Sequence, residues 1–515
     1  MEDKSKNIMM GVAIGSISAA AIGAIAYKIG LKKAGVAVDI AQNTVGLGDI
    51  HKILVCGSGM MVPGLVKYLM RNQKNHLTIA SNIIEDANTI ANSYAGRCTS
   101  CLLDANDLDA TVDLVREHDI VISFIPPFLH TKIFDACLKA KVNLVTASYI
   151  APEMEKYDQA VKDAGLIFLN ECGLDPGIDI MSTMKIKDEV EKAGGKITRY
   201  ESWCGGLPAA EDADNPLCYK FSWNPKAVFN TSRTSAVFLK DGEVVNISPE
   251  DLLTEGTESK DYMKSLHLEG YPNRDSLKFK ESFGFKDAKT FIRGTLRYGG
   301  FGVIMRALHQ IGYTDSNIAL DHSKIKTIRD FAEYLAEGFE PKVEGLEDVF
   351  EKANINKVED QKLFSRLIQK LIQKDDLASI LSSWVFFELL NSKREITEDM
   401  KTALDVMSVI SLEKMSYKDG ERDFVAMKHI FDIEEASGEK KTIHSTMMVC
   451  GDKTGSGGMS IMAKTVGYTS AIAVNLILEG KITRKGVISP KTEDIYSKIL
   501  PILEEDGITV VEEYK

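Results

Sequence analysis

Short apolar runs alternate with amphipathic segments along residues 51–170. The runs are HKILVC at 51–56, LTIAS at 77–81, CTSCLL at 98–103, DIVISFI at 119–125, NLVTAS at 143–148 and LIFLN at 166–170. Short apolar runs between helical patterns indicate βαβ units and a parallel sheet. Strands without polar alternation fit a sheet that is covered on both faces. We therefore predict an α/β fold with a parallel, Rossmann-type sheet over residues 51–175.

The pattern changes after Asp179. Residues 176–320 mix longer helical periods with strand patterns, and residues 321–418 have mostly helical patterns with charged faces. ERDFVAMKHIFDIEE and KKTIHSTMMVCGD then predict two strands that return to a sheet. TGSGGMSIMAKTVGYTSAIAVNLILEG predicts a glycine turn followed by two helices. With 515 residues, the chain is long enough for two or three domains.

The segment from Asn7 to Tyr27 contains no charged residue. About 20 uncharged residues can span a bilayer, and small residues recur there every four positions. Lysines are in excess on its C-terminal side. We predict a membrane-anchoring transmembrane helix at residues 8–27, then a linker to residue 50, with the rest of the chain in the cytoplasm. A cleaved or peripheral segment and a mitochondrial location are the alternatives.

Composition excludes some classes of function. The net charge is −12 and no basic patch is present, so a nucleic-acid partner is not expected. Eight cysteines are too few for a disulfide framework at this length, and they suit a reducing compartment. Cys98 and Cys101 form one C-x-x-C pair with no second pair nearby. We interpret both as structural and predict no metal site.

A glycine turn follows the first predicted strand. Gly57 and Gly59 are the first two glycines of a G-x-G-x-x-G pattern, and Val62 occupies the third position. A turn at this place puts a dinucleotide pyrophosphate on a helix N-terminus, although glycine turns also join strands to helices for geometric reasons alone. The second strand ends at Ser81 and Asn82 without an acidic residue. The absence of an acidic residue disfavours NAD, but no basic residue is there to bind the 2′-phosphate of NADP. The residues at this strand end therefore lean toward NADP without deciding the cofactor.

Substrate is expected beyond the C-terminal ends of the predicted strands. Tyr149 and Asp175 are the ionisable groups at those ends, with packing and a simple turn as their alternatives. Arg274 lies in YPNRDS, while Arg293 and Arg297 lie in RGTLRY. Guanidinium groups bind carboxylates in a bidentate manner, and a surface charge is the alternative for each arginine.

The stretch YESWCGGLPAAEDADNPLCYKFSW at 200–223 has neither helical period nor strand alternation. It predicts no core element. Three interpretations stay open from the residues alone: a surface loop, a structural pair of Cys204 and Cys218, or a loop that lines an active site.

Several long motifs resemble a known family. NECGLDPGIDIM, the stretch at 200–223, YPNRDS, RGTLRYGGF, GERDFVAMKHIFDIE and GSGGMSIMAKTVG are similar to saccharopine dehydrogenases of the NADP-dependent, L-glutamate-forming type, over about residues 51–515. The resemblance implies an oxidoreductase of lysine metabolism that uses NADPH. It implies reduction of the imine of 2-aminoadipate 6-semialdehyde and L-glutamate to L-saccharopine, and a homodimer.

The resemblance also implies a domain division. It comprises a Rossmann NADP-binding domain at 51–175, an α/β substrate domain at 176–320 and a helical domain at 321–418. Residues 419–475 would return to the substrate domain and residues 476–515 to the Rossmann domain. The stretch at 200–223 then becomes a lining loop with Cys204 toward the imine and Cys218 structural.

Site residues follow from the motif positions. For the cofactor, the resemblance implies Gly57, Ser58, Gly59 and Met60 at the pyrophosphate, Ser81 and Asn82 at the 2′-phosphate, Asp104 on the adenosine side, and Ile125, Ala147, Leu174 and Trp223 around the nicotinamide. For the substrate, it implies Ser148, Tyr149, Asp175, Arg274, Thr295, Leu296 and Arg297. Tyr149, Asp175 and Cys204 would move or position protons, which imine chemistry requires. A related imine-reducing dehydrogenase of the carboxynorspermidine type and a non-catalytic nucleotide-binding membrane scaffold are the alternatives.

Overall fold

A computed structural model describes residues 50–260, 265–374, 376–455 and 457–515. The described chain divides into two compact units. The first contains the residues up to Cys172 together with Ser470–Ser489, and the second contains Gly173–Thr469 and Pro490–Lys515. The predicted membrane anchor at residues 8–27 lies outside the described residues.

The first unit is built on a seven-stranded parallel sheet, which confirms the predicted Rossmann-like fold. The strand order is β15-β6-β5-β4-β1-β2-β3, so the chain reverses direction across the sheet between β1 and β4. The strands are β1 (His51–Cys56), β2 (Asn75–Ser81), β3 (Cys98–Leu102), β4 (Ile120–Ser123), β5 (Asn143–Thr146), β6 (Ile167–Leu169) and β15 (Gly486–Ile488).

The connecting helices of this unit are α3 (Val62–Leu69), α4 (Ile84–Asn92), α5 (Leu108–Arg116), α6 (His130–Ala140), α7 (Pro152–Glu155) and α8 (Asp158–Asp163). β1 and β4 are buried along most of their length because helices cover both faces of the sheet. Cys98 and Cys101 both lie on β3, at its first residue and next to its last residue. Cys98 and Cys101 are free thiols.

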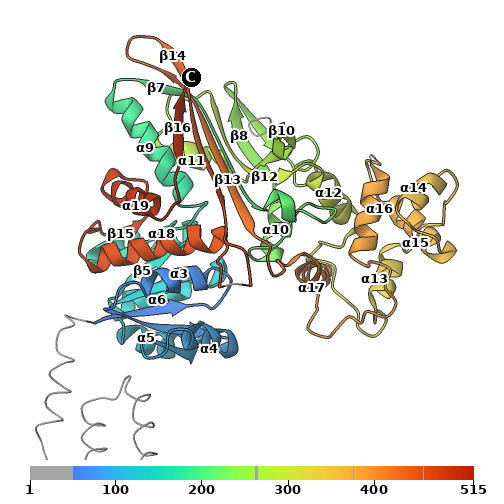
Figure 1. Cartoon of the computed structure of the whole chain (residues 1–515), viewed down its shortest axis with the longest axis horizontal. Helices are drawn as coiled ribbons and strands as arrows, with labels where there is room; N and C mark the ends of the chain where they lie inside the picture. Colours follow the sequence, from blue (N-terminus) through green and yellow to red (C-terminus); the bar gives the residue numbers. More distant parts are fainter. Residues whose placement is uncertain (1–49, 261–264, 375, 456) are drawn as a thin grey trace, which may run out of the picture. The chain divides into compact units, whose positions relative to one another are not determined.

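The second unit contains a nine-stranded mixed sheet (Figure 1). Its main order is β10-β11-β12-β7-β13-β14-β16, and only the pair of β12 and β7 is parallel. The strands are β7 (Lys196–Pro208), β8 (Ala236–Lys240), β9 (Glu243–Ile247), β10 (Glu258–Lys260), β11 (Leu268–Pro272), β12 (Thr290–Tyr298), β13 (Asp423–Glu434), β14 (Lys440–Cys450) and β16 (Val511–Tyr514). β13 and β14 confirm the two predicted returning strands.

Helices accompany this sheet and form a separate core beside it. Those near the sheet are α9 (Ile178–Lys192), α10 (Pro225–Thr231), α11 (Ser276–Phe283), α12 (Phe301–Ile311) and α19 (Glu493–Glu505). Residues 321–418 carry α13 (Ile328–Leu335), α14 (Glu347–Lys352), α15 (Val358–Ile368), α16 (Leu377–Phe386) and α17 (Ala403–Met415) (Figure 1). Trp384, Phe331 and Phe364 are fully buried in the core that these helices share with α10 and α12.

Three sequence predictions are wrong. The stretch from Tyr200 to Pro208 is the second half of β7, a central strand hydrogen-bonded on both sides, so it belongs to the core. Its residues are buried on both faces, and this removes the polar alternation that marks a half-exposed strand. The glycine turn after Gly455 leads into one helix, α18 (Ile461–Leu478), and not two. Residues 476–515 were expected to return to the Rossmann unit. Residues 476–489 do so, with β15 paired to β6, whereas residues 490–515 belong to the second unit, because β16 pairs with β14.

Among the described residues, α18 is the one helix whose length and composition would suit a membrane span. Within it, 78% of the residues are buried inside the protein. This burial is typical of the core helix of a globular domain.

Candidate active site

The glycine turn has the geometry of a nucleotide-binding loop. Gly57 has a φ of 117°, and its N–H donates to the carbonyl of Ala80 over 2.7 Å. A Cβ on Gly57 would lie 2.7 Å from the carbonyl oxygen of Phe124, so a side chain does not fit there. A Cβ on Gly59 would meet no atom within 4 Å. The open space at Gly59, just before α3, fits a pyrophosphate that approaches the backbone closely.

Two predicted cofactor residues meet across the ends of β1 and β2. The hydroxyl oxygens of Ser58 and Ser81 lie 2.8 Å apart, and the Ser81 hydroxyl also accepts the N–H of Ile83 over 3.1 Å. Asn82 and Met60 are exposed. Hydroxyl groups at this edge can donate to phosphate oxygens, and no carboxylate competes with a 2′-phosphate there.

Other predicted cofactor residues follow the remaining strands of this unit. Asp104 is exposed after β3, where its carboxylate accepts the N–H of Asn106 over 2.9 Å. Ile125 and Ala147 are half-buried just after β4 and β5. Because parallel strands present their C-terminal ends at one edge, these residues share that edge with the glycine turn.

His130 connects the ends of β4 and β5, and it was not predicted from the sequence. Its Nδ1 lies 2.9 Å from the Ser123 hydroxyl and its Nε2 lies 2.7 Å from the Ser148 hydroxyl. Burial lowers the pKa of His130 to about 4, so the ring is neutral near pH 7. It therefore fixes the hydroxyl of Ser148, next to the half-buried Tyr149. The available signal was a histidine at the start of a helix that follows a strand end.

In the second unit, Asp175 belongs to a buried cluster of charges. Nη2 of Arg293 donates to Oδ1 of Asp175 over 2.8 Å and to Oδ2 of Asp179 over 2.7 Å. The side chains of Asp175, Asp179 and Arg293 are 18%, 1% and 4% exposed. Burial and the negative charge of Asp175 raise the pKa of Asp179, and Arg293 opposes this effect. Asp179 was not predicted, because nothing in the sequence brings it to Arg293.

Cys204 lies on β7, on the same face of the sheet as Arg293. Cys204 pairs with Thr295 of β12, and residues two apart along a strand share a face. Burial, with the negative charges of Asp175 and Asp179, raises the pKa of the Cys204 thiol well above its usual range. The thiol is therefore protonated at neutral pH. Leu174, Leu296 and half-buried Thr295 complete the predicted residues in this part of the unit.

Arg297 is buried among aromatic rings. Its guanidinium carbon lies 4.9 Å from the ring centre of Tyr219 and 5.2 Å from that of Phe301. Within the described residues, its Nε and the Tyr219 hydroxyl are buried without a hydrogen-bond partner. Arg274 is exposed in the turn after β11, so the two arginines have different environments. Trp223 is half-buried against the helical core.

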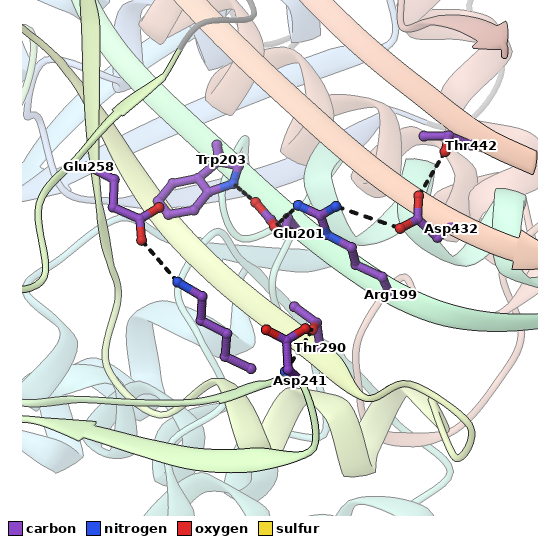
Figure 2. A network of polar contacts seen from close by, with 9 residues as sticks. Arg199, Glu201, Trp203, Asp241, Glu258, Thr290, Asp432 and Thr442 are labelled. Carbon is purple, nitrogen blue, oxygen red and sulfur yellow. Dashed lines mark hydrogen bonds and ion pairs between the residues drawn. The ribbon is translucent and has the colours of Figure 1, made fainter.

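The opposite face of the same sheet carries a polar network (Figure 2). Glu201 accepts the indole N–H of Trp203 over 2.9 Å and Nε of Arg199 over 3.0 Å. Asp432 lies 3.6 Å from Arg199 and accepts the hydroxyl of Thr442 over 2.8 Å. Strand alternation thus divides the stretch that starts at Tyr200, with Cys204 on the face of Arg293 and Trp203 on the other. Cys204 and Cys218 are both free thiols.

A parallel sheet with a glycine turn after its first strand defines the first unit as a dinucleotide-binding domain. Family models agree. The saccharopine dehydrogenase NADP binding domain matches residues 53–169, and the saccharopine dehydrogenase C-terminal domain matches residues 173–508. The chain belongs to the saccharopine dehydrogenase family, and its cofactor is NADP(H).

Individual relatives are similar over nearly the whole chain. Saccharopine dehydrogenase [NADP(+), L-glutamate-forming] of Pyricularia oryzae is 35% identical over 470 residues, which cover 88% of this chain and 96% of that protein. The apo structure of the L-Glu-forming enzyme from Saccharomyces cerevisiae has a TM-score of 0.78 at 34% identity, covering 90% of this chain and 100% of that one. Bovine mitochondrial alpha-aminoadipic semialdehyde synthase is 33% identical over 467 residues, which cover 90% of this chain and 48% of that protein.

Proposed function

We propose that this protein is an NADP-dependent saccharopine dehydrogenase of the L-glutamate-forming type. It reduces the imine of 2-aminoadipate 6-semialdehyde and L-glutamate to L-saccharopine, reversibly, in lysine metabolism. The observation that carries the proposal is the likeness to L-glutamate-forming enzymes along 88–90% of this chain and 96–100% of theirs. A shared Rossmann unit alone would support only a nucleotide-binding function.

The cofactor site consists of the glycine turn and the hydroxyl groups beside it. Gly57 and Gly59 admit the pyrophosphate. The hydroxyl groups of Ser58 and Ser81 donate to phosphate oxygens. Met60, Asn82 and Asp104 lie around other parts of the nucleotide. From their positions in the family's motifs, we assign Ile125 and Ala147 of the first unit to the nicotinamide. Leu174 and Trp223 of the second unit are assigned to it on the same ground. NADPH, when bound, supplies the hydride that reduces the imine carbon.

The substrate carboxylates bind to arginine. The buried Nε of Arg297 lacks a hydrogen-bond partner among the described residues, and buried polar groups are normally satisfied. A substrate carboxylate would satisfy this group after a small rearrangement. Arg274, exposed and on a turn, binds a second carboxylate. Thr295 and Leu296 of the second unit, and Ser148 of the first, are assigned to the substrate from their positions in the family's motifs.

Proton handling falls to Tyr149, Asp175 and Cys204. Imine formation releases one water, whose oxygen comes from the aldehyde and whose two hydrogens come from the neutral amine nitrogen. A group near the nitrogen must therefore accept and return protons. Asp175 is the carboxylate of the buried cluster with the most exposed side chain. It therefore exchanges the proton, while the protonated Cys204 thiol donates a hydrogen bond.

The test is an assay of the purified protein with NADPH, 2-aminoadipate 6-semialdehyde and L-glutamate. We expect NADPH oxidation only when both substrates are present, and a smaller rate with NADH. Turnover with a diamine in place of glutamate would instead favour the carboxynorspermidine type. NADPH binding, measured by fluorescence, without any turnover would favour the non-catalytic scaffold.

Membrane attachment through residues 8–27 and a homodimer are further parts of the proposal. The uncharged segment supports attachment. The bovine relative is a mitochondrial enzyme by name, which supports the mitochondrial alternative for this chain. Cell fractionation of the full chain and of a variant without residues 8–27 separates these locations. If residues 8–27 anchor the protein, the full chain is found in the membrane fraction and the shortened variant in the supernatant. Light scattering of the purified protein gives its oligomeric state.

A further inference from the structure

The arginine of the buried cluster contacts two carboxylates through one nitrogen. Nη2 of Arg293 lies 2.8 Å from Asp175 and 2.7 Å from Asp179. The guanidinium carbon also lies 4.1 Å from the ring centre of Phe279, and the backbone N–H of Arg293 donates to the Ser276 hydroxyl over 3.0 Å. These contacts fix the guanidinium, so it holds both carboxylates in defined places.

Asp179 also fixes the turn that carries Asp175. Its Oδ1 accepts the N–H of Gly177 over 2.7 Å, while its Oδ2 contacts Arg293. The backbone N–H of Asp179 donates to the carbonyl of Leu174 over 3.0 Å. The residues on both sides of Asp175 are therefore tied to Asp179, at the first turn of α9.

We propose that Asp179 and Arg293 are positioning residues that set the orientation and the charge of Asp175 in the reaction. The inference rests on the proposed function, in which Asp175 exchanges protons with the substrate. Asp179 is 1% exposed and Arg293 is 4% exposed, against 18% for Asp175. In this proposal Asp175, the most exposed of the three side chains, meets the substrate, and the other two act through it.

The other titratable groups around this cluster are neutral, with one exception. Burial raises the pKa of Tyr200 and of Cys204 on β7, so both keep their protons. Burial and the charge of Arg293 lower the pKa of His429 on β13 to about 3, so its ring is uncharged. Arg297 on β12 is the further cation that acts on this region. Two carboxylates thus face Arg293 in a buried place.

Opposite pH shifts in two variants follow from this arrangement. Asp179→Asn removes a negative charge, so the remaining carboxyl group loses its proton at lower pH, by about one pH unit. Arg293→Gln removes the cation, so the carboxylates lose their proton at higher pH, by about 1–3 units. Arg293→Lys keeps the positive charge, so we expect it to retain most of the wild-type pH profile. This variant still tests the role of the charge if Arg293→Gln does not fold.

The experiment is the pH profile of kcat and of kcat/KM for the full chain, with NADPH and both substrates. Asp423→Asn is the matched control. Asp423 is a second buried aspartate that accepts two backbone N–H groups at a helix start, from Ile461 over 2.7 Å and from Met462 over 2.9 Å. We expect it to lower stability as Asp179→Asn does, but to leave the pH profile unchanged.

The outcomes separate this inference from the proposed function. Active variants with the wild-type pH profile, or with shifts in the same direction, would overturn the positioning role and leave the function standing. A wild-type protein without turnover would overturn the proposed function. In that case the carboxyl titration of 13Cγ-aspartate-labelled protein, followed by NMR, still tests the opposite shifts in Asp179→Asn and Arg293→Gln.

Discussion

Two glycines in the nucleotide turn are expected to fail in different ways when each is replaced by alanine. Gly57 combines a φ of 117° with a Cβ position 2.7 Å from the carbonyl oxygen of Phe124. The left-handed backbone costs about 1–3 kcal/mol for a residue with a side chain, and overpacking costs about 1–3 kcal/mol more. Gly57→Ala should therefore destabilise the protein by about 2–6 kcal/mol, which is a large part of a typical domain stability.

Gly59→Ala is the matched control for this prediction. A Cβ there meets no atom within 4 Å, so the free energy of unfolding without cofactor should change by less than about 0.5 kcal/mol. The same methyl group occupies the space that we assign to the pyrophosphate. NADPH affinity should therefore fall at least about tenfold, or about 1.4 kcal/mol.

Urea unfolding without cofactor and NADPH titration by fluorescence measure the two effects separately. Gly57→Ala should shift the urea midpoint, while Gly59→Ala should shift the NADPH dissociation constant. Equal urea midpoints for wild type and Gly57→Ala would refute the steric reasoning. A Gly59→Ala variant that binds NADPH as wild type does would refute the placement of the pyrophosphate.

Three further predictions concern other residues. Burial lowers the pKa of His130 to about 4, against about 6.5 in an unfolded chain. The contribution of the neutral ring to stability is therefore complete above pH 6.5. As the pH falls to 4, up to about 3 kcal/mol of the free energy of unfolding is lost. Urea midpoints of wild type and His130→Gln across that range should converge at low pH. Arg297→Lys keeps the charge but loses the planar fork, so KM for the carboxylate substrate should rise about tenfold or more with a smaller change in kcat. An unchanged KM would contradict carboxylate binding there. Iodoacetamide at pH 8 should label the exposed Cys450 before the buried Cys204. The reason is that burial and nearby carboxylates keep the Cys204 thiol protonated. Peptide mass mapping shows the order of labelling. Earlier labelling of Cys204 would contradict its burial.

Local pattern was enough to predict the Rossmann unit. The first five strands are short apolar runs, and each is followed by a helix of the same unit, so this order of elements and the glycine turn can be found without tertiary information. β15, more than 300 residues further along the chain than β6, was not predicted. The strand ends then point to Ser81, Ser148 and Tyr149, because parallel strands deliver their C-terminal residues to one edge. His130 escaped prediction because its role depends on hydroxyl groups from two separate strands.

The stretch that begins at Tyr200 shows what local pattern cannot reveal. Its first residues form a central strand because β12 and β13 satisfy its backbone on both sides. Gly205 is required there because a Cβ would lie 2.7 Å from the carbonyl oxygen of Leu296. Only the pairing of strands distant in sequence decides these facts.

The sequence by itself determined the class of fold, the nucleotide turn and the motifs that connect the chain to its family. The tertiary structure alone brought Arg293 to Asp175 and Asp179, which lie 118 and 114 residues away in the chain. It also paired β16 with β14, so the last residues belong to the second unit. The physical reason is range: apolar periodicity and turn chemistry act over a few neighbouring residues, whereas buried charge pairs and sheet edges form only when distant segments pack together.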